Sequence, residues 1–366
     1  MLLLAVLCIV GCGKKKALTP SDLAENLDAP LIEVLEHVID MFGVDPAKVD
    51  YSIIPEGSML NAGYYLIRPW SFKESLRSIL NGAGYGVDWD FDREFYKVIK
   101  RDYFFLTEEE GSKMLEYLGS KYNDVESWEK RRDSVRLEMR HKMGLDNFPE
   151  HFNGAVYQML SAERMMDWLC ALPEADLERV GVTGASGGGT QTMFITAIDE
   201  RVTLSMPIVM PSAYYCGGCS CEGGTGIHLS GGYTNNMEIV SFCAPKPLLI
   251  VSDGGDWTAN TPEVELPFVK RIYGFYGAED KVENVHLADE VHDYGPSKRA
   301  AAYDFLVKQW GLDNSAVKNA DGTYDESGCV VEDFDLLKVW GPEGENWPEN
   351  AIRDIEEFAR VMCVKQ

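Results

Sequence analysis

Residues 179–192 read R-V-G-V-T-G-A-S-G-G-G-T-Q-T, and our prediction of the fold starts from them. Residues 179–183 form a β-branched run that suits a buried strand. Ser186 follows at a glycine turn and completes the pattern G-x-S-x-G, which is typical of a nucleophile elbow. Residues 191–198 then read as a helix. We therefore predict a strand, a sharp turn that carries Ser186, and a helix.

The residue types in this turn suit a serine nucleophile. A serine on a sharp strand-to-helix turn has a strained backbone, so its neighbours must be small. The helix that follows points its N-terminus at the serine, where developing negative charge is stabilised. The backbone N–H of Gly187 is therefore our candidate donor to an oxyanion. The alternative is an ordinary glycine turn in which Ser186 takes no part in chemistry.

Composition and charge limit the partners of this protein. The chain has 366 residues, 45% of them hydrophobic, which is enough for one large domain or two smaller ones. Its formal net charge of −25 argues against nucleic acid and anionic membrane surfaces as partners. Nine cysteines are too few for a disulfide-stabilised scaffold at this length.

The N-terminus has the pattern of a targeting segment. Residues 2–10 are apolar but too few to span a bilayer, and Gly11-Cys12 ends the run. This resembles a bacterial lipoprotein signal, residues 1–12, in which the cysteine becomes the acylated first residue. We therefore predict export, lipidation of Cys12 and anchoring on the periplasmic or cell-surface side of a membrane. An ordinary secretory signal and a buried apolar arm are the alternatives.

The rest of the chain divides by pattern into three regions. We expect residues 13–150 to be mainly helical, residues 151–312 to form the core, and residues 313–366 to form an acidic tail with a final helix. In the core, strands are predicted at 179–183, 202–210, 246–252 and 283–287, and helices at 191–198, 267–276 and 297–310. This alternation predicts an α/β fold with a mostly parallel sheet. The acidic and aromatic run at residues 88–92 is interpreted as a surface loop.

A serine hydroxyl needs a base, and the base needs an orienting acid. Asp256 and His292 each follow a predicted strand, so both stand where open α/β sheets place their sites. The order Ser, Asp, His also matches hydrolases built around G-x-S-x-G. Asp253 is the rival acid at the strand end itself, and His286 is the rival base inside an apolar strand. We prefer Asp256 and His292.

A group of cysteines beside a histidine raises the question of a metal. Cys216, Cys219 and Cys221 precede His228, but their spacing is irregular and a second C-x-x-C is absent from the sequence. A disulfide or packed thiols near the pocket are therefore the preferred interpretation. We predict neither a metal nor a cofactor.

Several further motifs together resemble one family. They are G-V-T-G-A-S-G-G-G-T-Q-T, A-I-D-E-R-V at 197–202, C-x-C-E at 219–222, G-D-W-T at 255–258, Y-G-A-E-D-K-V at 276–282 and H-D-Y at 292–294. Over residues 155–312 the chain resembles the bacterial acetyl xylan esterase-like branch of the α/β-hydrolases, and is similar to dienelactone hydrolase and prolyl oligopeptidase catalytic domains. The resemblance implies an α/β-hydrolase fold with Ser186 as nucleophile, Asp256 as acid and His292 as base. It also implies hydrolysis of a carboxylic ester, often on a carbohydrate.

The chain departs from this family ahead of the elbow. Family members place several strands there, with a loop, often of H-G type, that gives the second oxyanion donor. No histidine in this chain precedes a glycine, and apolar strand runs are lacking between residues 108 and 179. Residues 128–145 resemble a helix that the family carries before the first half of the sheet, yet here they run almost directly into residue 155. We therefore hypothesise that the first strands of the sheet are missing.

These inferences lead to a serine esterase that acts on a small-molecule or carbohydrate ester. A prolyl oligopeptidase-type peptidase is the nearest alternative. A non-catalytic lipoprotein with a degenerate hydrolase half is the alternative from another class, because the second oxyanion loop is not found.

Overall fold

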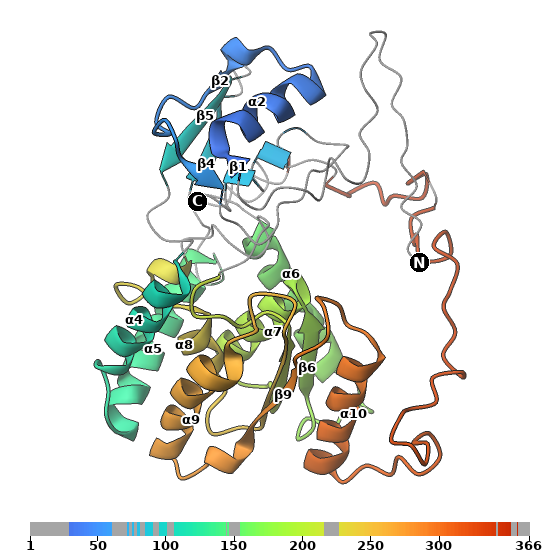
Figure 1. Cartoon of the computed structure of the whole chain (residues 1–366). Helices are drawn as coiled ribbons and strands as arrows, with labels where there is room; N and C mark the ends of the chain where they lie inside the picture. Colours follow the sequence, from blue (N-terminus) through green and yellow to red (C-terminus); the bar gives the residue numbers. More distant parts are fainter. Residues whose placement is uncertain are drawn as a thin grey trace. The chain divides into compact units, whose positions relative to one another are not determined.

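The computed structural model describes residues 29–60, 72, 75–76, 79–80, 85–90, 95–100, 106–143, 145, 154–215, 227–341, 343–352 and 357. The chain divides into two compact units, Met1–Lys113 with Ala213–Gly224, and Met114–Ser212 with Thr225–Gln366 (Figure 1). The described residues do not include Cys12, Cys216, Cys219 or Cys221. Within the described part, every helix is too short or too polar to cross a membrane.

In the smaller unit, a helix packs with a small sheet. Helix α2 (Leu31–Phe42) ends at Gly43, whose φ of 63° is the left-handed conformation that favours glycine. The described sheet has the order β2-β5-β4, with β2 (Val49–Asp50) parallel and β4 (Tyr85–Asp90) antiparallel to β5 (Phe95–Lys100). A separate pair joins β1 (Ala29–Pro30) to β3 (Met59–Leu60), and Pro46–Lys48 is a 3-10 turn. The core includes Leu35, Val38, Leu76 and Val98.

This sheet corrects one expectation from the sequence. Residues 88–90 are not a surface loop but the end of β4, where Asp88 pairs with Lys97 and Trp89 with Tyr96 on β5. The alternation of acidic and aromatic residues is therefore the period-two pattern of a strand. Pairing with β5 along the whole of β4 is what forms this strand in spite of the low strand propensity of Asp.

The larger unit is built around a parallel sheet. Its order is β6-β7-β8-β9, and every neighbouring pair is parallel. The strands are β6 (Gly181–Ala185), β7 (Leu204–Ile208), β8 (Leu248–Asp253) and β9 (Val282–Leu287). Each lies within two residues of its predicted position. The α/β fold with a mostly parallel sheet is thus confirmed.

Helices cover both faces of this sheet. The remaining described α-helices are α4 (Glu108–Gly119), α5 (Val125–Lys142), α6 (Gly154–Cys170), α7 (Gly187–Ile198), α8 (Asn236–Val240), α9 (Leu266–Phe275) and α10 (Pro296–Trp310). Short turns lie at Ile227–Leu229, Ser241–Cys243 and Glu279–Lys281, and a π-helical turn at Thr261–Glu265 leads into α9. Figure 1 shows α10 beside this sheet, and Ala302 and Phe305 of α10 pack in one cluster with Met206 and Val251 of the strands.

Strand β6 lies at an edge of the described sheet. Residues of β7 and β8 are all buried, whereas those of β6 are exposed or half-buried. Beside it, Met165 and Trp168 of α6 are 59% and 58% exposed, and Met165 borders a hollow of about 460 Å³ between α6, α7 and β6. The described residues before Arg179 contain one parallel pair of strands, β2 with β5, so the hypothesis of missing strands stays a prediction.

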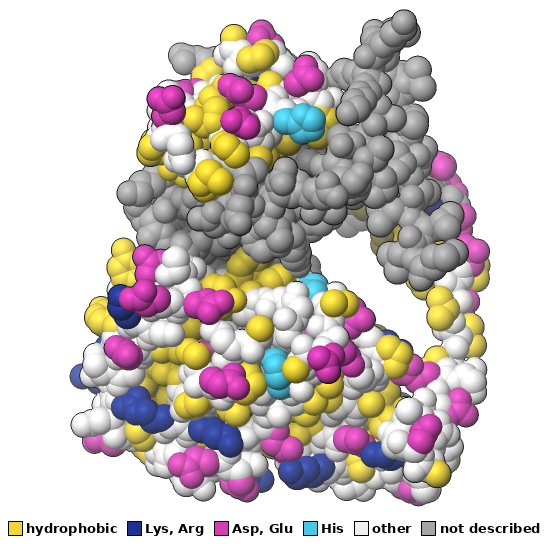
Figure 2. Space-filling model, in the orientation of Figure 1, with side chains coloured by type: hydrophobic (Ala, Val, Ile, Leu, Met, Phe, Trp, Pro, Cys, Tyr) yellow, Lys and Arg dark blue, Asp and Glu magenta, His cyan; other side chains and the backbone are white. Residues whose placement is uncertain are grey.

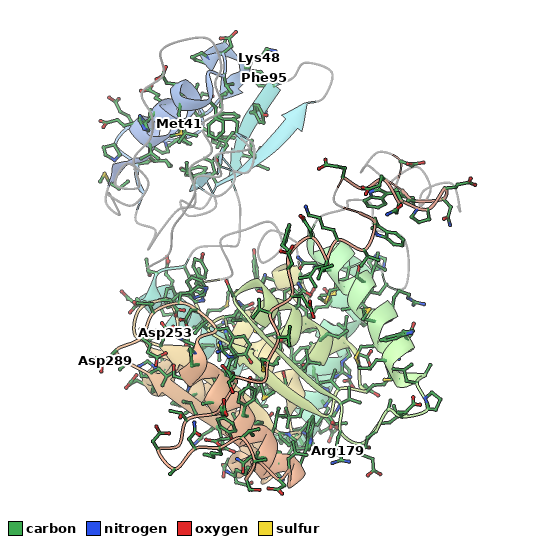
Figure 3. The ribbon with its side chains drawn as sticks, turned by 90° about the vertical axis from the view of Figure 1, so that its right-hand side faces the viewer. Met41, Lys48, Phe95, Arg179, Asp253 and Asp289 are labelled. Carbon is green, nitrogen blue, oxygen red and sulfur yellow. The ribbon has the colours of Figure 1, made fainter. Side chains whose placement is uncertain are left out.

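The polarity of the sheet defines where the site lies. Arg179 precedes β6 and Asp253 ends β8, and Figure 3 shows them at opposite ends of the larger unit. Because the strands are parallel, all their carboxyl ends gather at the end that carries Asp253. Acidic side chains are scattered over the face of this unit shown in Figure 2, so the negative charge marks no single patch there.

Candidate active site

Ser186 occupies a strained turn between β6 and α7. Its backbone has φ 56° and ψ −121°, a region that residues with a side chain rarely adopt. A Cβ on Gly184 would lie 2.5 Å from the backbone of Gly188, and one on Gly189 would lie 2.6 Å from Cβ of Met210. The glycines at 184 and 189 are therefore required by close packing. The Ser186 N–H donates to the carbonyl of Ile208 at 3.2 Å, which fixes the turn to the end of β7.

Gly187 is the first residue of α7. The first N–H groups of a helix have no acceptor within the helix, and they lie at the positive end of its dipole. The carbonyl of Ser186 accepts from Thr190 N at 3.0 Å, so the helix begins directly at the serine. The turn thus presents both a hydroxyl and a backbone donor at the same point.

Asp256 and His292 form a hydrogen-bonded pair. Oδ2 of Asp256 lies 2.6 Å from Nδ1 of His292, and Oδ1 accepts from both N and Oγ1 of Thr258 at 2.6 Å. The Asp256 side chain is 1% exposed and that of His292 is 22% exposed. A carboxylate held this way accepts a hydrogen bond from Nδ1–H, and Nε2 is then the ring nitrogen that can take a proton from a nucleophile.

Two loops pack tightly to make this pair. Gly254 and Gly255 stand against the loop after β9, since a Cβ on Gly254 would lie 2.0 Å from the carbonyl of Ala288 and one on Gly255 would lie 2.7 Å from that of Glu290. The sequence G-G-D at 254–256 is thus explained by the approach of the loop that carries His292. Larger side chains here would push the acid and the imidazole apart.

Trp257 is a site residue that the sequence analysis did not single out. Its ring lies 4.6 Å from that of His292, centre to centre, with an angle of 43° between the planes. Its Nε1 donates to the carbonyl of Met210 at 3.1 Å, so the indole is held against the segment after β7. An indole beside the imidazole limits how far the ring swings. The signal was present in G-D-W-T, because the tryptophan directly follows the acid.

Ser186 and His292 come from the same edge of the sheet. Ala185 pairs with Ile208, which pairs with Val251 in β8, and Asp253 pairs with Leu287 at the end of β9. Two further contacts connect the loop after β9 to β6. The hydroxyls of Thr183 and Tyr294 lie 2.8 Å apart, and Ala185 and Tyr294 pack against one hydrophobic cluster.

The rival residues have other partners. Asp253 is fully buried and lies 3.3 Å from Nζ of Lys298, and its burial, with the charge of Asp256, raises the pKa of its carboxyl. His286 lies within β9 with its Nδ1 2.8 Å from Oγ of Ser252. The structure therefore brings Asp256 together with His292 and places neither rival in that pair.

Of the cysteines and the histidine considered as metal ligands in the sequence, His228 is the one that lies among the described residues. Its Nε2 lies 2.8 Å from Oδ1 of Asn236, and burial lowers the pKa of His228 to about 4. No group of three or more potential metal-binding side chains occurs in the part of the chain that the structure describes. The three cysteines near it in sequence lie outside that part.

The parallel sheet, the turn at Ser186 and the helices on both faces define an α/β-hydrolase-type esterase fold. No protein-family model and no curated protein sequence matches the chain. Among solved structures, it is similar to "Methylesterase BT1017", with 30% identity, a TM-score of 0.65, and coverage of 92% of this chain and 98% of that one. The chain therefore belongs to the same family as this methylesterase.

More distant similarity reaches glucuronoyl esterases. The enzyme from Caldicellulosiruptor kristjansonii has 21% identity and a TM-score of 0.35 over 43% of this chain and 50% of its own. That from Hypocrea jecorina has 16% identity and a TM-score of 0.35 over 49% of this chain and 58% of its own.

Proposed function

We propose that this protein is a serine esterase that cleaves carboxylic esters on carbohydrates. The proposal rests chiefly on the pair formed by Asp256 and His292, whose side chains are 1% and 22% exposed, and on Ser186 in a strained turn at the same edge of the sheet. Membership of a family that contains a methylesterase supports it. Both an acyl ester of a sugar hydroxyl and a methyl ester of a sugar acid fit this reaction class.

The mechanism follows from the three side chains. Oγ of Ser186 attacks the ester carbonyl while Nε2 of His292 removes its proton, and Asp256 stabilises the imidazolium that forms. The Gly187 N–H and the N-terminus of α7 stabilise the negative charge on the carbonyl oxygen. The alcohol leaves with the proton from Nε2, and water then releases the acyl group from Ser186 by the same route.

The test is covalent labelling followed by substrate comparison. A fluorophosphonate probe should label the purified protein without residues 1–12, and Ser186→Ala should abolish the label. Wild type that has not been treated with the probe should then hydrolyse p-nitrophenyl acetate, acetylated xylan or a methyl-esterified uronic acid polymer, and prior labelling should abolish this activity. Cleavage of proline peptides alone would favour a peptidase. A folded protein that takes no label and cleaves no ester would favour the non-catalytic alternative.

We also propose that Cys12 is lipidated and anchors the esterase to a membrane. The support is the apolar run that ends in Gly11-Cys12. Expression of the full chain in bacteria fed an alkyne fatty acid should give a labelled, membrane-associated protein, and Cys12→Ser should give neither. Release of the wild type into the medium would instead indicate an ordinary secretory signal.

A further inference from the structure

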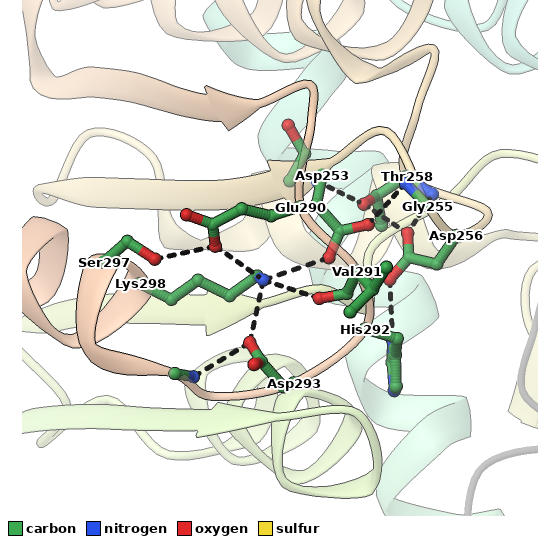
Figure 4. A network of polar contacts seen from close by, with 12 residues as sticks. Asp253, Gly255, Asp256, Thr258, Glu290, Val291, His292, Asp293, Ser297 and Lys298 are labelled. Carbon is green, nitrogen blue, oxygen red and sulfur yellow. Dashed lines mark hydrogen bonds and ion pairs between the residues drawn. The ribbon is translucent and has the colours of Figure 1, made fainter. Parts of the chain in front are cut away.

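Lys298 is a buried cation behind the active-site pair. It lies in the first turn of α10 and its side chain is fully buried. Its Nζ contacts Val291 O at 2.7 Å, Asp293 Oδ1 at 2.9 Å, Glu290 Oε2 at 3.2 Å and Asp253 Oδ2 at 3.3 Å (Figure 4). An ammonium is rarely buried unless oxygens surround it, so these partners account for its position.

Lys298 is connected to the residue before His292 by a direct contact and to the residue before Asp256 through Asp253. It binds the carbonyl of Val291 directly, and Val291 precedes His292. It also binds one oxygen of Asp253, whose other oxygen accepts from Gly255 N at 3.0 Å, and Gly255 precedes Asp256. One ammonium thus joins the two loops at the positions adjacent to the acid and the imidazole (Figure 4).

Lys298 also balances a buried charge. Asp253 is fully buried, and a carboxylate in such a place is costly unless a cation pairs with it. Without Lys298, an unpaired negative charge would stand beside Asp256. Asp293, on the other side of the cation, has its pKa lowered by the hydrogen bond from Lys298.

We propose that Lys298 is a positioning residue of the active site, which holds the His292 loop against the end of β8 and neutralises Asp253 so that Asp256 alone acts on the imidazole. The proposal rests on the esterase function proposed above. Lys298 does not touch the reacting atoms, so its role is exerted through Val291, Asp253 and Gly255.

The charged groups around this network come from three segments. Among the described residues they are Asp253 at the end of β8, Asp256 in the loop after it, Glu290, His292 and Asp293 after β9, and Lys298 on α10. Arg299, the next cation on α10, turns away and binds Tyr294 O and Glu326. Lys298 is thus the cation that offsets these carboxylates at the pair.

The test compares Lys298→Met with Lys298→Met/Asp253→Asn and with Lys308→Met. Lys308 lies on the same helix but is 62% exposed, with Glu283 as its partner, so its loss should change little. Lys298→Met should lower kcat by about 10²-fold with KM nearly unchanged, as expected when reacting groups are displaced. In the double variant, the amide that replaces the Asp253 carboxylate keeps an acceptor for Gly255 N and the local charge sum is that of the wild type, so much of kcat should return.

The pH profile distinguishes positioning from a merely structural role. Excess negative charge in Lys298→Met favours the imidazolium, so the acid limb of kcat/KM should move to higher pH and return in the double variant. The same displacement should appear in NMR titration of the His292 imidazole, assigned with His292→Gln. That titration needs no substrate, so it still tests Lys298 if wild type proves to hydrolyse no ester.

Two outcomes would overturn the proposal. One is a folded Lys298→Met protein with the kcat and pH profile of Lys308→Met. The other is a double variant as impaired as the single one, together with an unmoved His292 titration. If Lys298→Met does not fold, the double variant carries the test, because it removes the buried charge and the cation together. Its kcat should stay below that of Lys308→Met, since the contact with the Val291 carbonyl is lost, and a kcat equal to that of Lys308→Met would overturn the positioning role.

Discussion

Asp256 and His292 lie 2.6 Å apart, Oδ2 to Nδ1, yet their side chains are 1% and 22% exposed. The carboxylate end of the pair is therefore buried, and the imidazole end is partly exposed to solvent. Thr258 saturates the inner oxygen of the carboxylate, so the outer oxygen is left to hold the imidazole in one tautomer. This direction, from the buried acid to the more exposed imidazole, is what the proposed reaction at Ser186 requires.

Asp256→Asn should inactivate the enzyme without unfolding it. The amide presents either a donor or a weaker acceptor to Nδ1, so the imidazole loses the correct tautomer and its counter-charge. A loss in kcat of about 10³–10⁴-fold is expected for a triad acid. Steady-state kinetics with p-nitrophenyl acetate measure it. Asp289→Asn, an exposed neighbour after β9, is the matched control and should keep full activity.

Gly184→Ala and Gly188→Ala form a matched pair at the elbow. A Cβ on Gly184 would lie 2.5 Å from the backbone of Gly188, whereas a Cβ on Gly188 meets nothing within 4 Å. Gly184→Ala should therefore lower the melting temperature and abolish fluorophosphonate labelling. Gly188 lies in the first turn of α7, and the Gly188→Ala protein should be at least as stable as wild type. Its free energy of unfolding should rise by up to about 1 kcal/mol, because alanine has the higher helix propensity. Equal stability of the two variants would contradict the close packing of the turn.

Ser186→Gly should be more stable than Ser186→Ala. Both lack the nucleophile, but alanine keeps the strain of φ 56° and ψ −121°, which glycine relieves. A strained backbone of this kind costs about 1–3 kcal/mol, so the difference in free energy of unfolding should be on the order of 1 kcal/mol. Urea unfolding of the two inactive variants measures it. A Ser186→Ala protein as stable as Ser186→Gly would indicate that the turn is relaxed.

His228 should make the fold sensitive to acid. Burial lowers the pKa of His228 from an ordinary 6.5 to about 4, so the unfolded chain takes up its proton before the native protein does. Its contribution to stability is complete above pH 6.5 and is lost as the pH falls toward 4, amounting to about 3 kcal/mol. Urea unfolding at intervals across this range measures the slope.

The control for that experiment is His228→Gln, which keeps a polar atom near Asn236 without titrating. Its stability should fall less steeply than that of wild type between pH 6.5 and 4. Parallel curves for the two proteins would contradict the assignment of the acid sensitivity to His228.

Local sequence predicts the parts of the site but leaves choices between neighbours. G-x-S-x-G predicts the elbow because the turn depends on adjacent glycines. Asp253 ends β8 and Asp256 lies in the loop after it, so both are candidates for the acid of the pair. Which of them acts on the imidazole depends on Lys298, which is 45 residues from Asp253 in the sequence. In the sequence, Lys298 is one polar residue in a helix, and its complete burial follows from the loops that fold over it.

The N-terminal unit illustrates the same limit. The composition of residues 88–90 predicts a loop because Asp disfavours strands. The strand that the structure shows there is formed by pairing with β5, where Lys97 is the register partner of Asp88. Such pairing depends on contacts between segments, which a local pattern does not contain.

From the sequence alone, the succession of strands and helices between residues 179 and 310, the turn at Ser186 and the candidate acid and base could be predicted, because each depends on residues close together in the chain. Only the tertiary structure decided that Asp256 rather than Asp253 holds His292, that Trp257 lies against the imidazole, and that Lys298 is enclosed by oxygens of both loops. The physical reason is burial. Which charges must be paired depends on which atoms lose their water when distant loops come together.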